Sequence, residues 1–148
     1  MVCGILRGVS QENVELVERG FESFLATGEP PWEMFDEEIE VYDHDTPDQG
    51  SYRGHVGVGR WVEVWGAAWA EWSMEPSEFI DAGDSVVVCV RMKTKGRGSG
   101  IEIERQDALV YKVHEGKILR LDYYNSREQA LESVGRRQQS GKSRPSPR

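Results

Sequence analysis

The second half of the chain constrains the fold most, because apolar and polar residues alternate there between closely spaced turn sequences. Turn-forming residues occur at Ala82–Asp84, at the glycine-rich stretch 96–100 and at His114–Lys117. The segments between these turns have the period of two that is typical of half-buried strands. Strands that follow one another through short turns pair antiparallel. We therefore expect four successive strands, from about Pro76 to Asn125, in a strongly curved and mostly antiparallel sheet.

Two long helices are predicted before this sheet. The first is expected to begin at an N-cap on Ser10 and to end before Gly28 and the proline pair that follows. The second is expected from about His55 to Ala70, with a stripe formed by Val58, Trp61, Trp65, Ala68 and Trp72. Such a stripe fits a ligand platform, but a packed core is the more common use. A short strand from Ile39 to His44 and a closing helix from about Ser126 to Val134 complete an α+β domain with its helices on one sheet face.

Length and charge indicate one domain with two different ends. The 148 residues suit a single core, which we expect to span residues 10–135 between a flexible segment 1–9 and a disordered basic tail 136–148. The net charge is −8 although the last fourteen residues carry five basic side chains and no acid. An acidic body repels phosphate, so nucleic acid is not an expected partner.

The sequence carries no signal for a membrane, a metal or a nucleotide cofactor. It has no apolar run near the roughly 18 residues that cross a bilayer, and its start does not resemble a secretory signal. We therefore expect a cytoplasmic protein. Cys3 and Cys89 lack metal-ligand spacing, and the glycine-rich stretch 96–100 joins two strands without a following helix. We expect no metal and no cofactor.

Charged residues among the predicted strands are the candidates for chemistry. On the strand that follows the glycine-rich stretch, Arg105 and Asp107 share a face with apolar residues. On the last strand, strict alternation places one set of residues on the same face: Ile118, Arg120, Asp122 and Tyr124. If Arg91, Arg105, Asp107 and Asp122 converge in the concavity of the sheet, they form a polar cluster in an apolar cavity. The alternative is two structural ion pairs at the rim of the sheet.

Four sequence phrases, together with the order of elements, carry a family resemblance: Tyr52–His55, Phe79–Asp84, Glu115–Ile118 and Ser126–Leu131. Over about residues 10–135 the chain resembles the SnoaL-like group of the nuclear transport factor 2-like superfamily. The resemblance implies a cone-shaped fold in which a curved sheet wraps around the N-terminal helices and leaves a central pocket. It also implies a homodimer formed through the outer face of the sheet.

The resemblance implies roles for single residues. SnoaL-type polyketide cyclases use an acid on the final strand, which falls on Asp122. Limonene epoxide hydrolase has an acid there too and an Arg-x-Asp, which aligns with Arg91–Lys93, so the second acid is lost unless Asp107 replaces it. Ketosteroid isomerase has its base near Asp43 and a tyrosine where this chain has Phe21. Steroid isomerisation is therefore not expected.

The leading hypothesis is cofactor-free acid/base chemistry, of a cyclase or isomerase type, on a small hydrophobic carbonyl compound. Asp122 would be the acid/base, with Arg91 and Asp107 as further catalytic residues, because burial raises and a neighbouring arginine lowers the pKa of a carboxyl group. The expected ligand-binding residues are Arg105, Tyr124, Asp43, His44, Trp61 and Trp65. The rival hypothesis is a non-catalytic ligand-binding or dimerisation module, and the third is an epoxide hydrolase-like enzyme.

Overall fold

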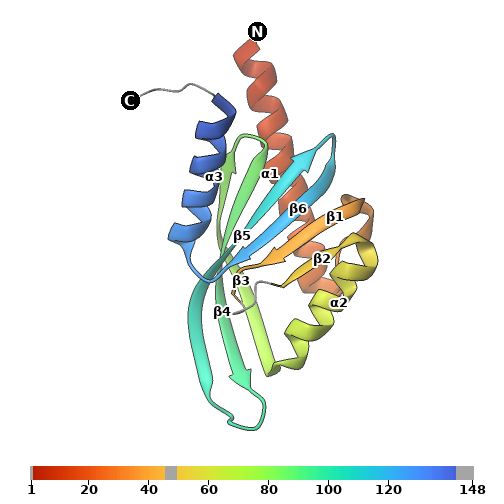
Figure 1. Cartoon of the computed structure of the whole chain (residues 1–148), viewed down its shortest axis with the longest axis vertical. Coiled ribbons are helices and arrows are strands. Elements are labelled where there is room, and N and C mark those ends of the chain that lie inside the picture. Colours follow the sequence, from red (N-terminus) through yellow and green to blue (C-terminus); the bar gives the residue numbers. More distant parts are fainter. Residues whose placement is uncertain (1, 46–49, 143–148) are drawn as a thin grey trace.

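A computed structural model describes residues 2–45 and 50–142 and has the expected α+β architecture (Figure 1). Its elements follow one another as α1 (Val2–Thr27), a 3₁₀ helix η1 (Trp32–Met34), β1 (Phe35–Asp43), β2 (Ser51–Arg53), α2 (Gly54–Ala67), β3 (Trp69–Ala82), β4 (Ser85–Gly96), β5 (Glu102–His114), β6 (Lys117–Tyr124) and α3 (Arg127–Lys142). None of the helices in these two ranges is both long and apolar enough to cross a bilayer.

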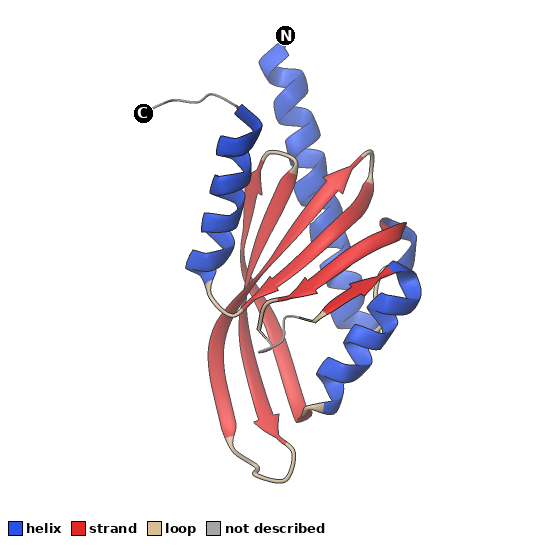
Figure 2. Ribbon diagram, viewed as in Figure 1, coloured by secondary structure: helices blue, strands red, loops and turns tan. Residues whose placement is uncertain are grey.

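Six strands form one curved, open sheet in the order β2-β1-β6-β5-β4-β3 (Figure 2). The four strands β3 to β6 pair antiparallel in chain order, which confirms the predicted series of hairpins. Strand β1 pairs parallel with the last strand, β6, with Val41 opposite Leu121 and Asp43 opposite Tyr123. This parallel pairing brings the first and last strands together inside the sheet, while the short β2 forms its edge.

The two faces of the sheet are covered by different helices. On the inner face, Val17 and Phe21 of α1 and Val58 of α2 pack with the sheet in the main core. On the outer face, Ala130 and Val134 of α3 pack in a second, smaller cluster. The expectation that all helices cover one face is therefore correct for α1 and α2 and wrong for α3.

The helix ends differ from the predicted ones. Helix α1 begins at Val2, so Ser10 lies inside the helix and is not its N-cap. Helix α3 continues to Lys142, past the predicted domain end at residue 135. Residues 143–148 of the predicted tail lie outside the described residues.

The second helix is shorter than predicted, because it ends at Ala67 and the chain enters β3 at Trp69. Trp72 was expected on the helical stripe but lies in β3, opposite Thr94 of β4. The long hairpin with β4 overrides the local helical spacing, since all residues of β3 except Ala70 and Ser77 gain a ladder partner there.

A β-bulge on β6 decides which residues face inward. Lys112 of β5 pairs with Arg120, and Val113 pairs with Ile118, so Leu119 is left without a ladder partner. Ile118 and Leu121 consequently lie on the inner face, while Arg120 lies on the outer face. Strict alternation had placed Ile118 and Arg120 on one face, and that expectation is wrong.

Candidate ligand-binding cavity

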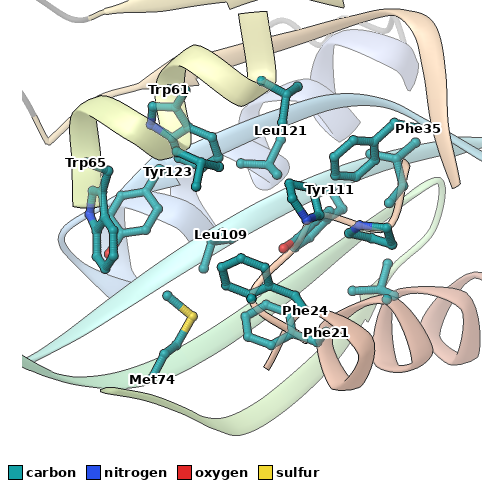
Figure 3. A pocket seen from close by; sticks show the side chains of 18 of the residues that line it. Phe21, Phe24, Phe35, Trp61, Trp65, Met74, Leu109, Tyr111, Leu121 and Tyr123 are labelled. Atoms are coloured by element: carbon teal, nitrogen blue, oxygen red, sulfur yellow. The ribbon is translucent and has the colours of Figure 1, made fainter. Parts of the chain in front are cut away.

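An apolar cavity of about 120 Å³ lies between α1, α2 and the inner face of the sheet (Figure 3). Most of its lining is aliphatic or aromatic: Val17, Phe21, Phe24, Phe35, Val58, Trp61, Val62, Trp65, Trp72, Met74, Leu109, Ile118 and Leu121. A single water needs about 10–15 Å³, and an engineered cavity of about 150 Å³ binds benzene. The cavity therefore has the apolar character of such a site and a volume somewhat below that of the benzene-binding cavity.

Aromatic rings mark the end at which the cavity reaches the surface. Trp72 of β3 stacks on Phe24 of α1 with ring centroids 5.9 Å apart, and Trp65 of α2 meets Trp72 edge-on at 5.0 Å. Trp72 and the nearby Gly28 are the exposed members of the lining. The cavity is therefore open to the surface between the end of α1, the end of α2 and the start of β3.

Two tyrosines are the ionisable residues of the described lining. Tyr111 and Tyr123 come from the adjacent strands β5 and β6, and Figure 3 shows them on either side of Leu109. The Tyr123 hydroxyl donates a hydrogen bond to Oδ2 of Asp107. Burial and the neighbouring Asp107 charge raise the pKa of Tyr123. Tyr123 is therefore a neutral hydrogen-bond donor at neutral pH.

Asp107, which contacts the Tyr123 hydroxyl group but does not line the cavity, is completely buried. Arg105 Nε lies 3.0 Å from its Oδ1 and donates a hydrogen bond of 3.2 Å to its Oδ2, while Arg105 Nη2 donates to Asp45 Oδ2 at 2.6 Å. Oδ1 accepts no hydrogen bond from the residues that the structure describes. Burial raises the pKa of Asp107, and the hydrogen bond from Tyr123 and the charge of Arg105 only partly oppose this.

Asp43 and Trp61 join this group to the cavity. Trp61 lines the cavity and donates its Nε1 hydrogen to Asp43 Oδ2 at 2.8 Å, and Asp45 donates its backbone N–H to Asp43 Oδ1 at 2.9 Å. We call Asp43, Asp45, Arg105, Asp107 and Tyr123 the inner polar cluster. Tyr123 is the member of this cluster that lines the cavity. Trp61, which also lines the cavity, is joined to the cluster by its hydrogen bond to Asp43.

Asp122 does not face the cavity, so that expectation is wrong. It pairs with Tyr42 of β1 and Val110 of β5, whereas the cavity-lining Leu121 and Tyr123 point to the opposite face. Asp122 is completely buried in an ion-pair network on the outer face of the sheet. Both the alternation on β6 and the family resemblance had placed Asp122 in the cavity.

Asp122 and its two partners, His44 and Arg120, form what we call the outer ion-pair network. Arg120 donates from Nε and Nη2 to the two carboxylate oxygens at 2.9 and 3.1 Å, and His44 Nε2 lies 2.8 Å from Oδ1. The His44 ring stacks on Tyr124 with centroids 4.4 Å apart. His44 and Tyr124, expected to bind ligand, thus contact each other and Asp122 on the outer side.

Arg91 also points away from the cavity. It is half-exposed and pairs with the exposed Glu75 at 3.2 Å across β3 and β4. Of the four charged residues expected to converge, only Arg105 and Asp107 contact each other. The epoxide hydrolase hypothesis needed Asp107 near an arginine and a water shared with Asp122. The structure provides the contact with Arg105, but Asp122 lies on the other face.

Neither cavity tyrosine had a predicted role from the sequence. Tyr111 was placed on the apolar face of its strand but was given no role, and Tyr123 was assigned to the face opposite Asp122. Their signal was the polar tip of a large side chain in a buried position, where a hydroxyl group normally finds a partner. No group of three His, Cys, Asp or Glu side chains that could hold a metal occurs in residues 2–45 and 50–142.

The model of the SnoaL-like domain family matches residues 18–121. The chain therefore belongs to the SnoaL-like domain family, as the sequence phrases had indicated. The matched region ends one residue before Asp122 and so does not extend to either Asp122 or Tyr123. No curated protein matches the sequence significantly.

Solved structures show the same nuclear transport factor 2-like fold. TerC, co-crystallised with polyporic acid, has a TM-score of 0.67 at 18% identity, covering 83% of this chain and 98% of its own. An NTF2-like protein from Burkholderia pseudomallei K96243 has a TM-score of 0.66 at 17% identity, and the match covers 82% of this chain and 96% of that protein. A protein described as a SnoaL-like polyketide cyclase, from Jannaschia sp. CCS1, has a TM-score of 0.64 at 17% identity. The match covers 84% of this chain and 91% of that protein.

Proposed function

We propose that the chain binds a small, mainly apolar carbonyl compound in the cavity and assists its cyclisation or isomerisation without a cofactor. One observation carries this proposal: an apolar cavity whose wall includes a tyrosine hydroxyl bonded to a completely buried carboxyl group, Asp107. A cavity with few polar groups and a residue of shifted pKa is the usual form of a small-molecule site. The crystal complex of TerC with polyporic acid supports a ligand in this fold.

The chemistry follows from the pairing of Tyr123 with Asp107. When Asp107 is protonated, it can donate its proton to the Tyr123 oxygen, and the tyrosine proton can then bond to a ligand carbonyl oxygen. A hydrogen bond in an apolar site polarises the carbonyl group and stabilises the charge that develops on its oxygen. Burial raises the pKa of Asp107, which makes this protonated form easier to reach than in an ordinary aspartate, although the form that pairs with Arg105 is the ionised one. Asp107 is thus the proton source and Tyr123 the group that touches the ligand.

A binding protein without catalysis is the second candidate. The observation in its favour is that no carboxylate, histidine or lysine belongs to the cavity lining in the described parts of the chain. Any proton transfer must therefore pass through a tyrosine, and a tyrosine of raised pKa is a poor base.

Deuterium exchange separates the two candidates. With acetophenone as the probe in D₂O, NMR measures how fast its methyl protons are replaced. We expect the wild-type protein to accelerate this exchange, and Tyr123→Phe to lose about a hundredfold of the acceleration while still binding the ketone. Binding without any acceleration in the wild type would contradict the catalytic proposal and leave a ligand-binding protein.

A further inference from the structure

The second tyrosine of the cavity has a hydroxyl group that the fold does not use. Tyr111 lies on β5 and is only 8% exposed. It lines the cavity on one side of Leu109, and Tyr123 lines it on the other side (Figure 3). Its ring contacts Phe21 edge-on, with centroids 6.4 Å apart. In Figure 3 its oxygen points toward the side where Phe21 and Phe24 lie.

No residue in the described ranges accepts a hydrogen bond from Tyr111 or donates one to it. Burial alone raises its pKa, without any contribution from a charged or hydrogen-bonding neighbour. Tyr123 is buried to a similar extent but has Asp107 as its partner. The Tyr111 oxygen is not among the fully enclosed polar atoms that lack a partner in the described ranges, so it keeps accessible area on the cavity wall, where a hydrogen-bonding partner would be favourable.

A phenylalanine would pack equally well at the position of Tyr111. The ring contacts of Tyr111 are apolar, and its neighbours in the cavity wall, Phe21 and Leu121, are apolar too. Packing therefore explains the ring of Tyr111 and does not explain its oxygen. An oxygen directed into a ligand-sized cavity has a use when a ligand supplies the missing partner.

We propose that the Tyr111 hydroxyl binds a second oxygen of the ligand, distinct from the carbonyl oxygen at Tyr123. The ligand class is then a ring-sized, mainly apolar molecule that carries two oxygens at separated positions, one for each tyrosine. This inference rests on the proposed function, because it assigns the second polar contact of the same site. Its geometric basis is the position of the two tyrosines on adjacent strands on either side of Leu109.

Two probes that differ in one group test the inference. 4-Hydroxyacetophenone and 4-methylacetophenone have similar shape, and only the first has an oxygen in place of the methyl carbon. Isothermal titration of the wild type should show about tenfold tighter binding of the hydroxyl compound, and Tyr111→Phe should abolish this preference. Tyr123→Phe serves as the control, since it should weaken both ligands and keep the preference for the hydroxyl compound.

The outcomes distinguish this inference from the proposed function. If both probes bind the wild type and Tyr111→Phe with unchanged ratios, the role of Tyr111 is overturned and the cavity remains a ligand site. If neither probe binds the wild type, the proposed function and this inference both fail. Thermal melting without ligand gives a second readout, because Tyr111→Phe should be at least as stable as the wild type. A melting temperature lowered as far as in Tyr123→Phe would show a structural role for the hydroxyl group and overturn the inference.

Discussion

Replacing Arg105 by methionine is expected to destabilise the protein by about 3 kcal/mol at neutral pH, because it leaves Asp107 as a buried charge without a cation. The side chain of Asp107 is completely inaccessible, whereas Arg105 is 31% exposed and bridges it to Asp45. After the substitution, only the Tyr123 hydroxyl group would donate a hydrogen bond to this carboxylate among the contacts described above. Urea denaturation of both proteins measures the difference in the free energy of unfolding.

The matched control is Arg91→Met, which makes the same change in an exposed ion pair. Arg91 is 49% and Glu75 73% exposed, so the loss should stay within about 0.5 kcal/mol. If the two substitutions cost the same, the inner polar cluster does not hold a charged Asp107. The fold would be unaffected, but Asp107 would not depend on Arg105 for its charge.

The cost of Arg105→Met should also depend on pH. The pKa of Asp107 is raised in the folded protein, so the folded state holds a proton more tightly than the unfolded chain, whose aspartates titrate near about 3.9. Such a group lowers stability as pH rises from the unfolded pKa through the folded pKa. Loss of Arg105 raises the folded pKa further and extends this decline. The difference between the variant and the wild type should therefore shrink toward pH 4 and be largest at neutral pH.

Asp122→Asn is expected to cost about 2–3 kcal/mol of stability and to leave ligand affinity unchanged. The carboxylate accepts two hydrogen bonds from Arg120 and lies 2.8 Å from His44 Nε2, and an amide cannot accept from all of these donors. Because Asp122 lies on the sheet face opposite the cavity, the dissociation constant for acetophenone should change by less than about twofold, or 0.4 kcal/mol.

Glu104→Gln is the control for this prediction, since it removes the same charge from an exposed pair with Lys93 at 3.7 Å. It should change stability by no more than about 0.5 kcal/mol. A different result for Asp122→Asn, with full stability but no turnover, would restore Asp122 as the acid/base that the resemblance implied. Chemical denaturation combined with the deuterium exchange assay decides between these outcomes.

The sequence predicted the fold well because its strongest signals are local. Turn residues and alternation over residues 76–125 are sufficient to predict the antiparallel series, and the same alternation correctly placed Arg105 and Asp107 on one face. The parallel pairing of β1 with β6 joins segments far apart in the chain, and no local pattern reports it. The homodimer through the sheet stays a prediction.

The site was harder to predict because it depends on which face of β6 points inward. Ile118 and Asp122 are four residues apart, so strict alternation assigns them to the same face. The bulge at Leu119 places them on opposite faces, and nothing in the sequence marks that bulge. Tertiary contacts determine which of the two residues faces the cavity. Asp122 contacts His44 and Arg120 on the outer face, and Tyr123 lines the cavity.

The most direct test of the central claim, that the cavity holds the ligand, is a titration of acetophenone into the wild type and into Leu109→Phe. Leu109 lines the cavity between the two tyrosines, and a phenylalanine there would occupy the space of a ring (Figure 3). Far-UV circular dichroism and melting confirm that the variant is folded, since overpacking costs about 1–3 kcal/mol. We predict one saturable site in the wild type and at least about a tenfold loss of affinity in Leu109→Phe. Equal affinity in a folded Leu109→Phe would contradict the account.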